Sequence, residues 1–494
     1  MMDRLSEKNL WRATADVQSV PYDRAAVTPG IVHLGVGAFH RAHQAVFTDD
    51  RLVDGEADWG IVAVSMRSAD TRDALEPQNN LYTLALRDSD GERLRIVGSI
   101  KKTIVAPESP EQLLAAMSDP AIRIVTLTVT EKGYTANLAA RTLDTAHADV
   151  VHDLANPSTP KSVLGYLTEA ILRRRRSGTA PFTLLSCDNL PSNGATLKAV
   201  LTEFARRRDP ELADFIATNV SCPSSMVDRI VPATTDADRK RISSELGLQD
   251  AWPVVAEPYF QWVIEDRFPT GRPRWERSGV QFVKDVVPFE HMKLRMLNGA
   301  HTAIAAIGQI AGMETVADTV AEGAVQAFLK TYWGQAGLTI DPSLDPQGYA
   351  ARLLDRFSNP SLRHRTEQIA SDASQKLPQR VLAPLAEVVA MGLARDALVF
   401  AVAAWIQSCA AHDERGNPLR VNDPTFRAWA EGRSLEGLGS ADIVDEFFLF
   451  AQVFDGSWRD DASLRFAVAA ALDNIRNLGV IAALERAFGS AAKG

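Results

Sequence analysis

The chain has 494 residues, of which 46% are hydrophobic and 23% are charged, with a formal net charge of -9 and a pI near 5.6. This length exceeds one ordinary hydrophobic core and predicts two domains, and the composition excludes a disordered chain. The acidic balance argues against a nucleic-acid partner, because such proteins present clustered basic surface.

Local signals favour a cytoplasmic protein. The basic run at residues 173–176 is typical of a solvated helix end. Cys187, Cys222 and Cys409 lie far apart with no C-x-x-C pair, which is the pattern of a reducing compartment. No secretory signal is visible at the start, and the most apolar run, at residues 397–406, is too short to cross a bilayer.

The first half alternates between β-type and helical patterns. A short apolar run at residues 31–34 leads into glycines, and a second apolar run follows at residues 59–65, which together predict a βαβ unit. Further β-rich runs, interleaved with helical patterns such as that at residues 162–176, are found at residues 94–100, 122–129 and 182–186. Such alternation predicts a mostly parallel sheet covered on both faces.

The second half is helical. From about residue 288 strand signals become sparse, and helical patterns dominate at residues 292–311, 316–332, 384–411 and 462–488. We therefore expect an α/β chain with a Rossmann-like dinucleotide-binding domain at residues 1–285 and an all-α domain at residues 286–494. The cleft between two such domains is the expected site.

Gly35 and Gly37 form the first two glycines of a G-x-G-x-x-G pattern, and His40 stands where the third would be. Glycines are needed because the turn is tight and the backbone must approach a pyrophosphate. Asp70 follows the second strand, where a carboxylate binds the adenosine ribose and favours NAD over NADP, although Arg67 leaves room for NADP. The alternative is that Ser68 and Asp70 cap a helix.

Lys293, Asn298 and His301 are spaced to share one broad helix face. At about 100° per residue, Asn298 lies roughly 140° and His301 roughly 80° from Lys293. Hydride leaves a carbinol carbon only as the hydroxyl proton is taken, and a buried lysine can serve as that base. An amide can then stabilise the developing oxyanion. The alternative is a surface lysine followed by polar residues within a helix.

Six segments together resemble the polyol-specific long-chain dehydrogenases, the family of mannitol 2-dehydrogenase and fructuronate reductase (mannonate oxidoreductase). They span most of the chain in the family's order: residues 35–44 (GVGAFHRAHQ), 127–134 (LTVTEKGY), 186–191 (SCDNLP), 226–232 (MVDRIVP), 257–266 (EPYFQWVIED) and 293–301 (KLRMLNGAH).

The resemblance implies a role for each matching residue. Lys293 would be the general base of the family's K-x4-N-x2-H motif, and Asn298 and Asn189 the amides that hold the reacting oxygen. His301 would orient the substrate hydroxyls. The remaining expected positions are Asp228, Lys376 and Glu290 for the substrate, with Glu290 as a proton relay, and Gly35, Gly37, Phe39, His40, Arg41 and Asp70 for the cofactor, NAD.

Other interpretations of single residues remain open. Cys187 beside Asp188 could be a nucleophile, but a packed thiol is favoured because no histidine is near in sequence. His40 and His43 could form a metal pair, but without a third ligand they are more typical of contacts at a helix start. We expect no metal.

The expected reaction is NAD-dependent, metal-independent oxidation of a sugar alcohol to a ketose, as in mannitol to fructose. The alternative within the class is reduction of fructuronate to mannonate, which needs a cation such as Arg363, Arg365 or Lys376 for the carboxylate. An arginine of the mannitol enzymes is replaced by Gln368, which leaves the substrate open. From another class, the chain could be a nucleotide-binding regulator without turnover. The sequence does not indicate an oligomeric state.

Overall fold

The computed structural model describes residues 2–89, 91–138, 140–410, 412–419 and 421–489. Residue 411, the end of the helix expected at 384–411, lies outside this part, as do the chain ends of both expected domains. The chain divides into two compact units, Met1–Val287 and Pro288–Gly494, where the sequence predicts a boundary after residue 285.

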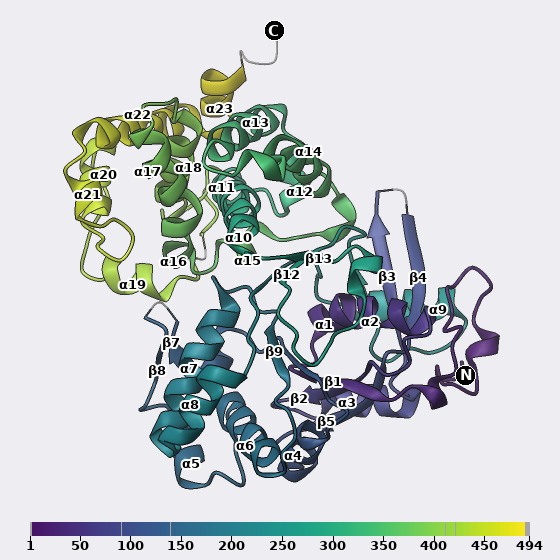
Figure 1. The fold of residues 1–494 in the computed structure, drawn as a ribbon. Coiled ribbons are helices and arrows are strands. Elements are labelled where there is room, and N and C mark those ends of the chain that lie inside the picture. Colours follow the sequence, from purple (N-terminus) through teal and green to yellow (C-terminus); the bar gives the residue numbers. More distant parts are fainter. Residues whose placement is uncertain (1, 90, 139, 411, 420, 490–494) are drawn as a thin grey trace. The chain divides into compact units, whose positions relative to one another are not determined.

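The first unit is built on a five-stranded parallel sheet with the order β5-β2-β1-β6-β9 (Figure 1). The prediction of a parallel Rossmann-like sheet is confirmed. The chain steps outward from β1 through β2 to β5 and then returns to β6 on the other side of β1. Ligands of such sheets bind beyond the carboxyl ends of the strands at this reversal. The strands are β1 (Pro29–Leu34), β2 (Gly60–Ser65), β5 (Ile100–Val105), β6 (Ile124–Leu127) and β9 (Thr183–Ser186).

Both faces of this sheet are buried, because alternate residues of each strand point to opposite sides. Val32 and Leu34 pack in one hydrophobic cluster with α4 (Pro110–Ser118), α6 (Val163–Arg176) and α7 (Asn193–Arg208), the blue and teal helices of Figure 1. Ile31 packs in a second cluster with residues of α2 (Gln44–Val53). The sheet is therefore a rigid support for the loops at its carboxyl edge.

Smaller sheets and helices complete this unit. The run expected as one strand at residues 94–100 is two, because the chain breaks at Gly98 and Ser99 between β4 and β5. The smaller sheets are β11-β3-β4, β10-β12-β13 and β7-β8, with β3 (Tyr82–Asp88), β4 (Gly91–Val97), β7 (Ala136–Asn137), β8 (Thr142–Leu143), β10 (Ser225–Asp228), β11 (Val254–Ala256), β12 (Gln261–Glu265) and β13 (Gln281–Val283). The other α-helices are α1 (Ala38–Ala42), α3 (Asp70–Leu75), α5 (Ala148–Ala155), α8 (Pro210–Asn219) and α9 (Asp236–Leu246).

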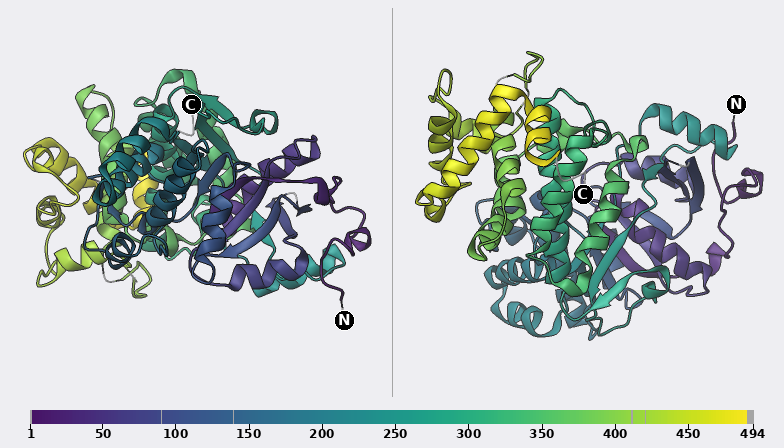
Figure 2. Two further views of the ribbon diagram at one scale, coloured as in Figure 1. Left: turned by 60° about the horizontal axis from the view of Figure 1, so that its bottom comes forward. Right: turned by 90° about the horizontal axis from the view of Figure 1, so that it is seen from above.

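The second unit, green to yellow in Figure 2, is helical, and its described residues contain no strand. One hydrophobic cluster runs through it. Its helices are α10 (Val287–Met292), η6 (Lys293–Asn298), α11 (Gly299–Ile310), α12 (Val316–Val320), α13 (Gly323–Gly337), α14 (Pro346–Phe357), α15 (Thr366–Ala370), α16 (Ala373–Leu377), η9 (Pro378–Leu382), α17 (Ala383–Ala390), α18 (Asp396–Ser408), α19 (Pro424–Ala430), α20 (Ser440–Phe448), α21 (Gly456–Arg459), α22 (Ala462–Leu478) and α23 (Val480–Phe488).

Two expected long helices are each broken at a glycine. Gly392 separates α17 from α18 and has a φ of +68°, and Gly479 separates α22 from α23 with a φ of +83°. Residues with positive φ end a right-handed helix, and glycine adopts that conformation at little cost. The expected helix at residues 316–332 is likewise divided between α12 and α13.

The basic run at residues 173–176 is only partly solvated. The side chain of Arg174 is 2% exposed, and its guanidinium donates hydrogen bonds to the carbonyl oxygens of Met117, Asp119, Ile122 and Ala180. The prediction of a solvated helix end is therefore wrong for this residue. None of the helices in the described part of the chain has both the length and the hydropathy to cross a membrane.

Candidate active site

The loop after β1 has the geometry of a dinucleotide-binding turn. Gly35 has a φ of +96°, and a Cβ at this residue would overlap the carbonyl oxygen of Thr128, which follows the neighbouring strand β6. A Cβ at Gly37, by contrast, would come no closer than 3.9 Å to any neighbour among the described residues. The fold itself therefore requires the first glycine, whereas the second leaves open space at the start of α1, as a phosphate-binding loop needs.

His40, in the place of the third glycine, is a buried packing residue. Its ring stacks on that of His33 at 3.4 Å between centroids, and His33 in turn hydrogen-bonds to the Thr126 and Thr128 hydroxyls at 2.7 and 2.9 Å. Burial lowers the pKa of His40 well below its usual range and lowers that of His33 to about 3. His33 and His40 therefore pack against the glycine loop as neutral imidazoles.

The other expected cofactor residues differ in accessibility. Phe39 is partly buried and stacks on His43. Arg41 is 4% exposed, and its guanidinium donates a hydrogen bond to the carbonyl oxygen of Trp252. This side chain therefore stabilises the loop within the protein interior. Asp70 is exposed as the first residue of α3 and accepts a hydrogen bond from Ser68, whereas the residue before it, Ala69, makes no side-chain cap. Asp70 is therefore available to a ligand.

Asn189 follows β9 at the same edge of the sheet and is exposed. The preceding residue, Asp188, is buried and accepts hydrogen bonds from the backbone N–H of Thr130 at 2.8 Å and from the Tyr134 hydroxyl at 2.8 Å. Burial raises the pKa of the Asp188 carboxyl. Asn193 Nδ2 donates to the Asp188 carbonyl at 3.0 Å. These bonds fix the backbone from which Asn189 projects, a support that the sequence analysis missed.

Asp228 is the last residue of β10, which lies in the small sheet β10-β12-β13. It is 5% exposed, and the next residue, Arg229, donates to the carbonyl oxygens of Glu257 and Ala42. Asp228 is therefore a buried carboxylate at a strand end.

The segment from Lys293 to Asn298 is a π-helix, although an α-helix was expected. The N–H of Gly299 bonds to the carbonyl oxygen of Leu294, five residues earlier. An i→i+5 bond stacks residue i+5 over residue i, so Asn298 lies above Lys293 and not roughly 140° around the axis, as an α-helix of about 100° per residue would place it. Lys293, Asn298 and His301 are 8%, 8% and 6% exposed, so none is a surface residue.

Two polar side-chain atoms of these three residues are buried without a hydrogen-bond partner among the described residues. They are Asn298 Nδ2 and His301 Nε2. Buried polar groups are nearly always hydrogen-bonded, and exceptions mark places where a ligand or water binds. The His301 ring packs at 4.3 Å on Phe357 and edge-on to His364 at 5.3 Å. Burial, then His364, Arg356, Arg380 and Lys293, lower the pKa of His301, so this imidazole is neutral.

The remaining expected substrate residues of the helical unit are more dispersed. Glu290 lies in α10, one turn before Lys293, and is partly buried. Lys376 in α16 is partly buried and donates to the carbonyl oxygen of Ser371. Arg363 is exposed, with a side chain that is 73% accessible, 3.6 Å from Glu314. Arg356 and His364 were missed because no motif marks them; only folding brings them to His301.

The described residues contain no group of three or more His, Cys, Asp or Glu residues arranged to hold a metal ion. Cys187 is buried, and burial raises the pKa of its thiol, which keeps it in the unreactive protonated form. Cys222 and Cys409 likewise have thiol pKa values raised by burial.

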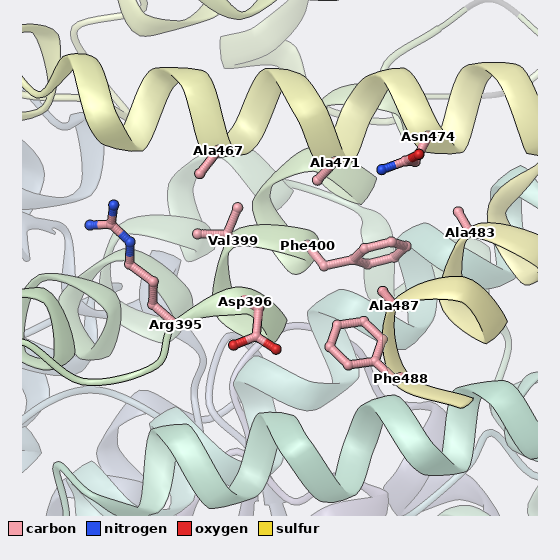
Figure 3. A pocket seen from close by; sticks show the side chains of 10 residues that line it. All are labelled: Arg395, Asp396, Val399, Phe400, Ala467, Ala471, Asn474, Ala483, Ala487 and Phe488. Carbon is pink, nitrogen blue, oxygen red and sulfur yellow. The ribbon is translucent and has the colours of Figure 1, made fainter. Parts of the chain in front are cut away.

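A separate hollow in the helical unit contains none of the expected site residues. It has a volume of about 320 Å³ and lies among α18, α22 and α23, with an alanine-rich, largely apolar lining (Figure 3). The lining residues are Arg395, Asp396, Val399, Phe400, Ala467, Ala471, Asn474, Ala483, Ala487 and Phe488.

Comparison with known proteins agrees with this architecture. Residues 29–277 match the family model of the mannitol dehydrogenase Rossmann domain, and residues 285–476 match that of the mannitol dehydrogenase C-terminal domain. D-mannonate oxidoreductase of Escherichia coli (strain K12) is 43% identical over 467 residues, which cover 93% of this chain and 95% of that protein.

Two further relatives are mannitol 2-dehydrogenases. The protein of Pyrenophora tritici-repentis (strain Pt-1C-BFP) is 38% identical over 98% of this chain and 86% of its own length. The Pseudomonas fluorescens enzyme, solved as a ternary complex with NAD and D-mannitol, is 36% identical and superposes with a TM-score of 0.86 over 99% of this chain and all of that chain. The chain therefore belongs to the mannitol dehydrogenase family of oxidoreductases.

Proposed function

We propose that the protein catalyses NAD-dependent, reversible oxidation of a secondary alcohol in an open-chain polyhydroxy substrate, without a metal and with Lys293 as the general base. The observation that carries this proposal is the wall formed by Lys293, Asn298 and His301, where a buried amine accompanies an amide and an imidazole that each have a buried atom with no hydrogen-bond partner in the described part of the chain. Such a wall can bind the hydroxyl groups of a substrate that fills it.

In the proposed reaction, Lys293 accepts the hydroxyl proton of the reacting carbinol. Burial and neighbouring positive charge favour the neutral form of an amine, the form that can accept a proton. The Asn298 amide N–H stabilises the oxygen as negative charge develops on it, with Asn189 as the proposed second amide. The neutral His301 donates or accepts hydrogen bonds with adjacent hydroxyls, and Asp228, Glu290 and Lys376 are the further proposed substrate contacts.

NAD, when bound, accepts the hydride. The residues fit this cofactor because Gly35 makes the tight turn at the reversal of strand order, while the space beside Gly37 admits a phosphate. The exposed Asp70 would bind the ribose hydroxyls. The Pseudomonas fluorescens relative solved with NAD supports the same choice.

Two classes of substrate are candidates. The sequence motifs favour a sugar alcohol such as mannitol, which the relatives named mannitol 2-dehydrogenase support. A sugar acid is favoured by the relative named D-mannonate oxidoreductase, at 43% identity. Both classes use the same base and the same cofactor.

The test is Lys293→Ala, with Lys330→Ala as a matched control because Lys330 is an exposed lysine of α13 in the same unit. We expect Lys293→Ala to lower kcat about 10³-fold or more while NADH affinity, measured by fluorescence titration, stays within about twofold. In wild type, kcat/KM should rise with pH as the proposed base loses its proton, and this rise should be absent from Lys293→Ala. The control should behave as wild type.

Two outcomes would contradict the proposal. Retained turnover in Lys293→Ala would remove the base assignment. A wild-type protein that binds NADH but oxidises neither D-mannitol nor D-mannonate, and reduces neither corresponding ketone, would favour the alternative of a nucleotide-binding regulator.

A further inference from the structure

The helical unit holds a cation that the proposed reaction does not use. Arg380 lies in the π-helix η9, which packs on the π-helix η6 that carries Lys293 and Asn298. The approach is close, because the Tyr332 hydroxyl bonds to the Arg295 carbonyl at 3.1 Å and reaches the Arg380 carbonyl at 3.4 Å. Gly299 makes this approach possible, since a Cβ there would lie 2.6 Å from the Arg380 carbonyl oxygen.

The guanidinium of Arg380 has no carboxylate partner among the described residues. Its hydrogen bond is to a neutral group, from Nη1 to the Thr302 hydroxyl at 3.3 Å. Burial lowers the pKa of Arg380 to about 10. Nearby Arg295 shows the usual arrangement, because it forms two hydrogen bonds with the Glu387 carboxylate, at 2.7 and 2.9 Å. A partly buried cation without a counterion is costly unless a ligand supplies the negative charge.

Arg380 lies beside the wall formed by Lys293, Asn298 and His301. Thr302 follows His301 directly, and its hydroxyl donates to the Asn298 carbonyl at 3.0 Å. Besides Arg380, the cations Arg356 and Lys293 lie near enough to His301 to lower its pKa. An anionic substrate interacts favourably with these positive charges, whereas a neutral sugar alcohol does not.

The spacing indicates where the negative charge of the substrate lies. Lys293 and Thr302 are nine positions apart, about two turns along a helix that begins as the π-helix η6. Arg380 meets this helix at Thr302. A substrate that contacts both Lys293 and Arg380 therefore suits a chain of several carbons between its reacting carbinol and its carboxylate.

We propose that Arg380, positioned by its hydrogen bond to the Thr302 hydroxyl, binds the carboxylate of an open-chain sugar acid whose reacting carbinol lies several carbons away at Lys293. The inference rests on the proposed function and adds the class of substrate. It also replaces two of the three cations expected from the sequence, since Arg363 and Arg365 are exposed beside Glu314, and Arg365 also pairs with Glu367. Lys376 remains a proposed substrate contact.

The experiment compares D-mannonate and D-mannitol as substrates with NAD for wild type, Arg380→Met, Arg380→Lys and the control Arg365→Met. We expect wild type to prefer the acid. In Arg380→Met the ratio of kcat/KM for acid to that for alcohol should fall roughly 10- to 100-fold, mainly through KM, because a charge-assisted hydrogen bond is lost. Arg380→Lys should give an intermediate ratio, since lysine keeps the positive charge but lacks the planar guanidinium that forms two parallel hydrogen bonds. Arg365→Met should keep the wild-type ratio.

Folding of each variant is checked by circular dichroism and NADH titration, and Arg380→Lys keeps the test valid if Arg380→Met does not fold. An unchanged ratio in the Arg380 variants, or a wild type that oxidises mannitol as well as mannonate, would overturn the inference while the proposed function stands. Retained activity in Lys293→Ala would overturn the proposed role of Lys293 as the base, while the assignment of Arg380 to the carboxylate would stand. If neither compound turns over, protection against thermal unfolding by mannonate decides: protection that Arg380→Met loses supports the subsite, and no protection of wild type refutes it.

Discussion

Gly35 and Gly37 occupy equivalent places in a sequence motif but have different structural roles. Gly35 has a φ of +96° and lies against the Thr128 carbonyl, whereas Gly37 has a φ of −96° and open space beside it. The first glycine is therefore required by the folded chain. The second is needed only when a ligand approaches.

This difference predicts opposite effects of alanine at the two positions. Gly35→Ala should lower the free energy of unfolding by about 3 kcal/mol, because it adds backbone strain to a steric overlap. Gly37→Ala should leave it within about 0.5 kcal/mol while weakening NADH binding. Urea unfolding and NADH titration measure the two effects. Equal loss of stability in both variants would contradict the assignment.

Single residues show what the sequence could and could not predict. The glycine motif and the K-x4-N-x2-H motif are local, so they could be recognised. Arg174 and Arg380 could not be predicted, because the burial of an arginine depends on carbonyl oxygens and helices far along the chain. A basic run indicates charge but not the direction in which each side chain points.

The two π-helices depend on a glycine at their contact. A Cβ on Gly299 would overlap the Tyr332 hydroxyl. One on Gly334, exposed within α13, would have no neighbour within 4 Å in the part of the chain that the structure describes. Gly299 thus allows η9 to approach the helix that carries the proposed base.

Alanine at these two helical glycines should act in opposite directions. Gly299→Ala should destabilise the protein by about 2 kcal/mol or more and lower activity, because η9 must move away. Gly334→Ala should stabilise it by about 0.5–1 kcal/mol through helix propensity alone. Thermal unfolding with parallel activity assays measures both. A stabilised, active Gly299→Ala variant would show that the close contact is dispensable.

For the helices and strands, the sequence correctly predicts which segments are helical and which are extended. It predicts less accurately where one helix ends and the next begins. The parallel strands were found because each is a short apolar run after a turn signal. The π-helix was not predicted, because the expected spacing follows the α-helical period throughout and no residue type specifies an i→i+5 bond. The breaks at Gly392 and Gly479 were missed because both glycines lie within patterns that otherwise remain helical.

Both units keep histidines buried and neutral, which predicts a pH dependence of the whole protein. Burial lowers the pKa of His33 and His40 in the first unit and of His301 and His364 in the second. The unfolded chain binds protons as the pH falls below about 6.5, whereas folded His33 does not until about pH 3. Stability should therefore be complete above pH 6.5 and decline below it.

The expected slope between those limits is on the order of 1.4 kcal/mol per pH unit for each such histidine. Urea unfolding at pH 7, 6, 5 and 4 measures it for wild type and for His33→Gln, in which the decline should be shallower. His412→Gln is the matched control, because His412 is exposed. A His33→Gln slope equal to that of wild type would contradict the prediction.

For the whole molecule, composition and periodicity were enough to predict the class of fold: a parallel α/β sheet followed by helices. The positive wall around His301 could not be predicted, because its members are spread from Lys293 to Arg380 and no local pattern links them. Their convergence results from the packing of η9 on η6 and of Phe357, in α14, on His301 of α11.

The state of the three cysteines has a practical consequence for spectroscopy. Cys187 and Cys222 are buried and Cys409 is partly buried, and all three thiols have raised pKa values, so the wild-type chain serves as a background that alkylating dyes leave largely unlabelled. A cysteine introduced at an exposed position, such as Val151 in the first unit or Phe466 in the second, would then carry a fluorophore at a single defined place. Its emission would report on that unit alone during turnover.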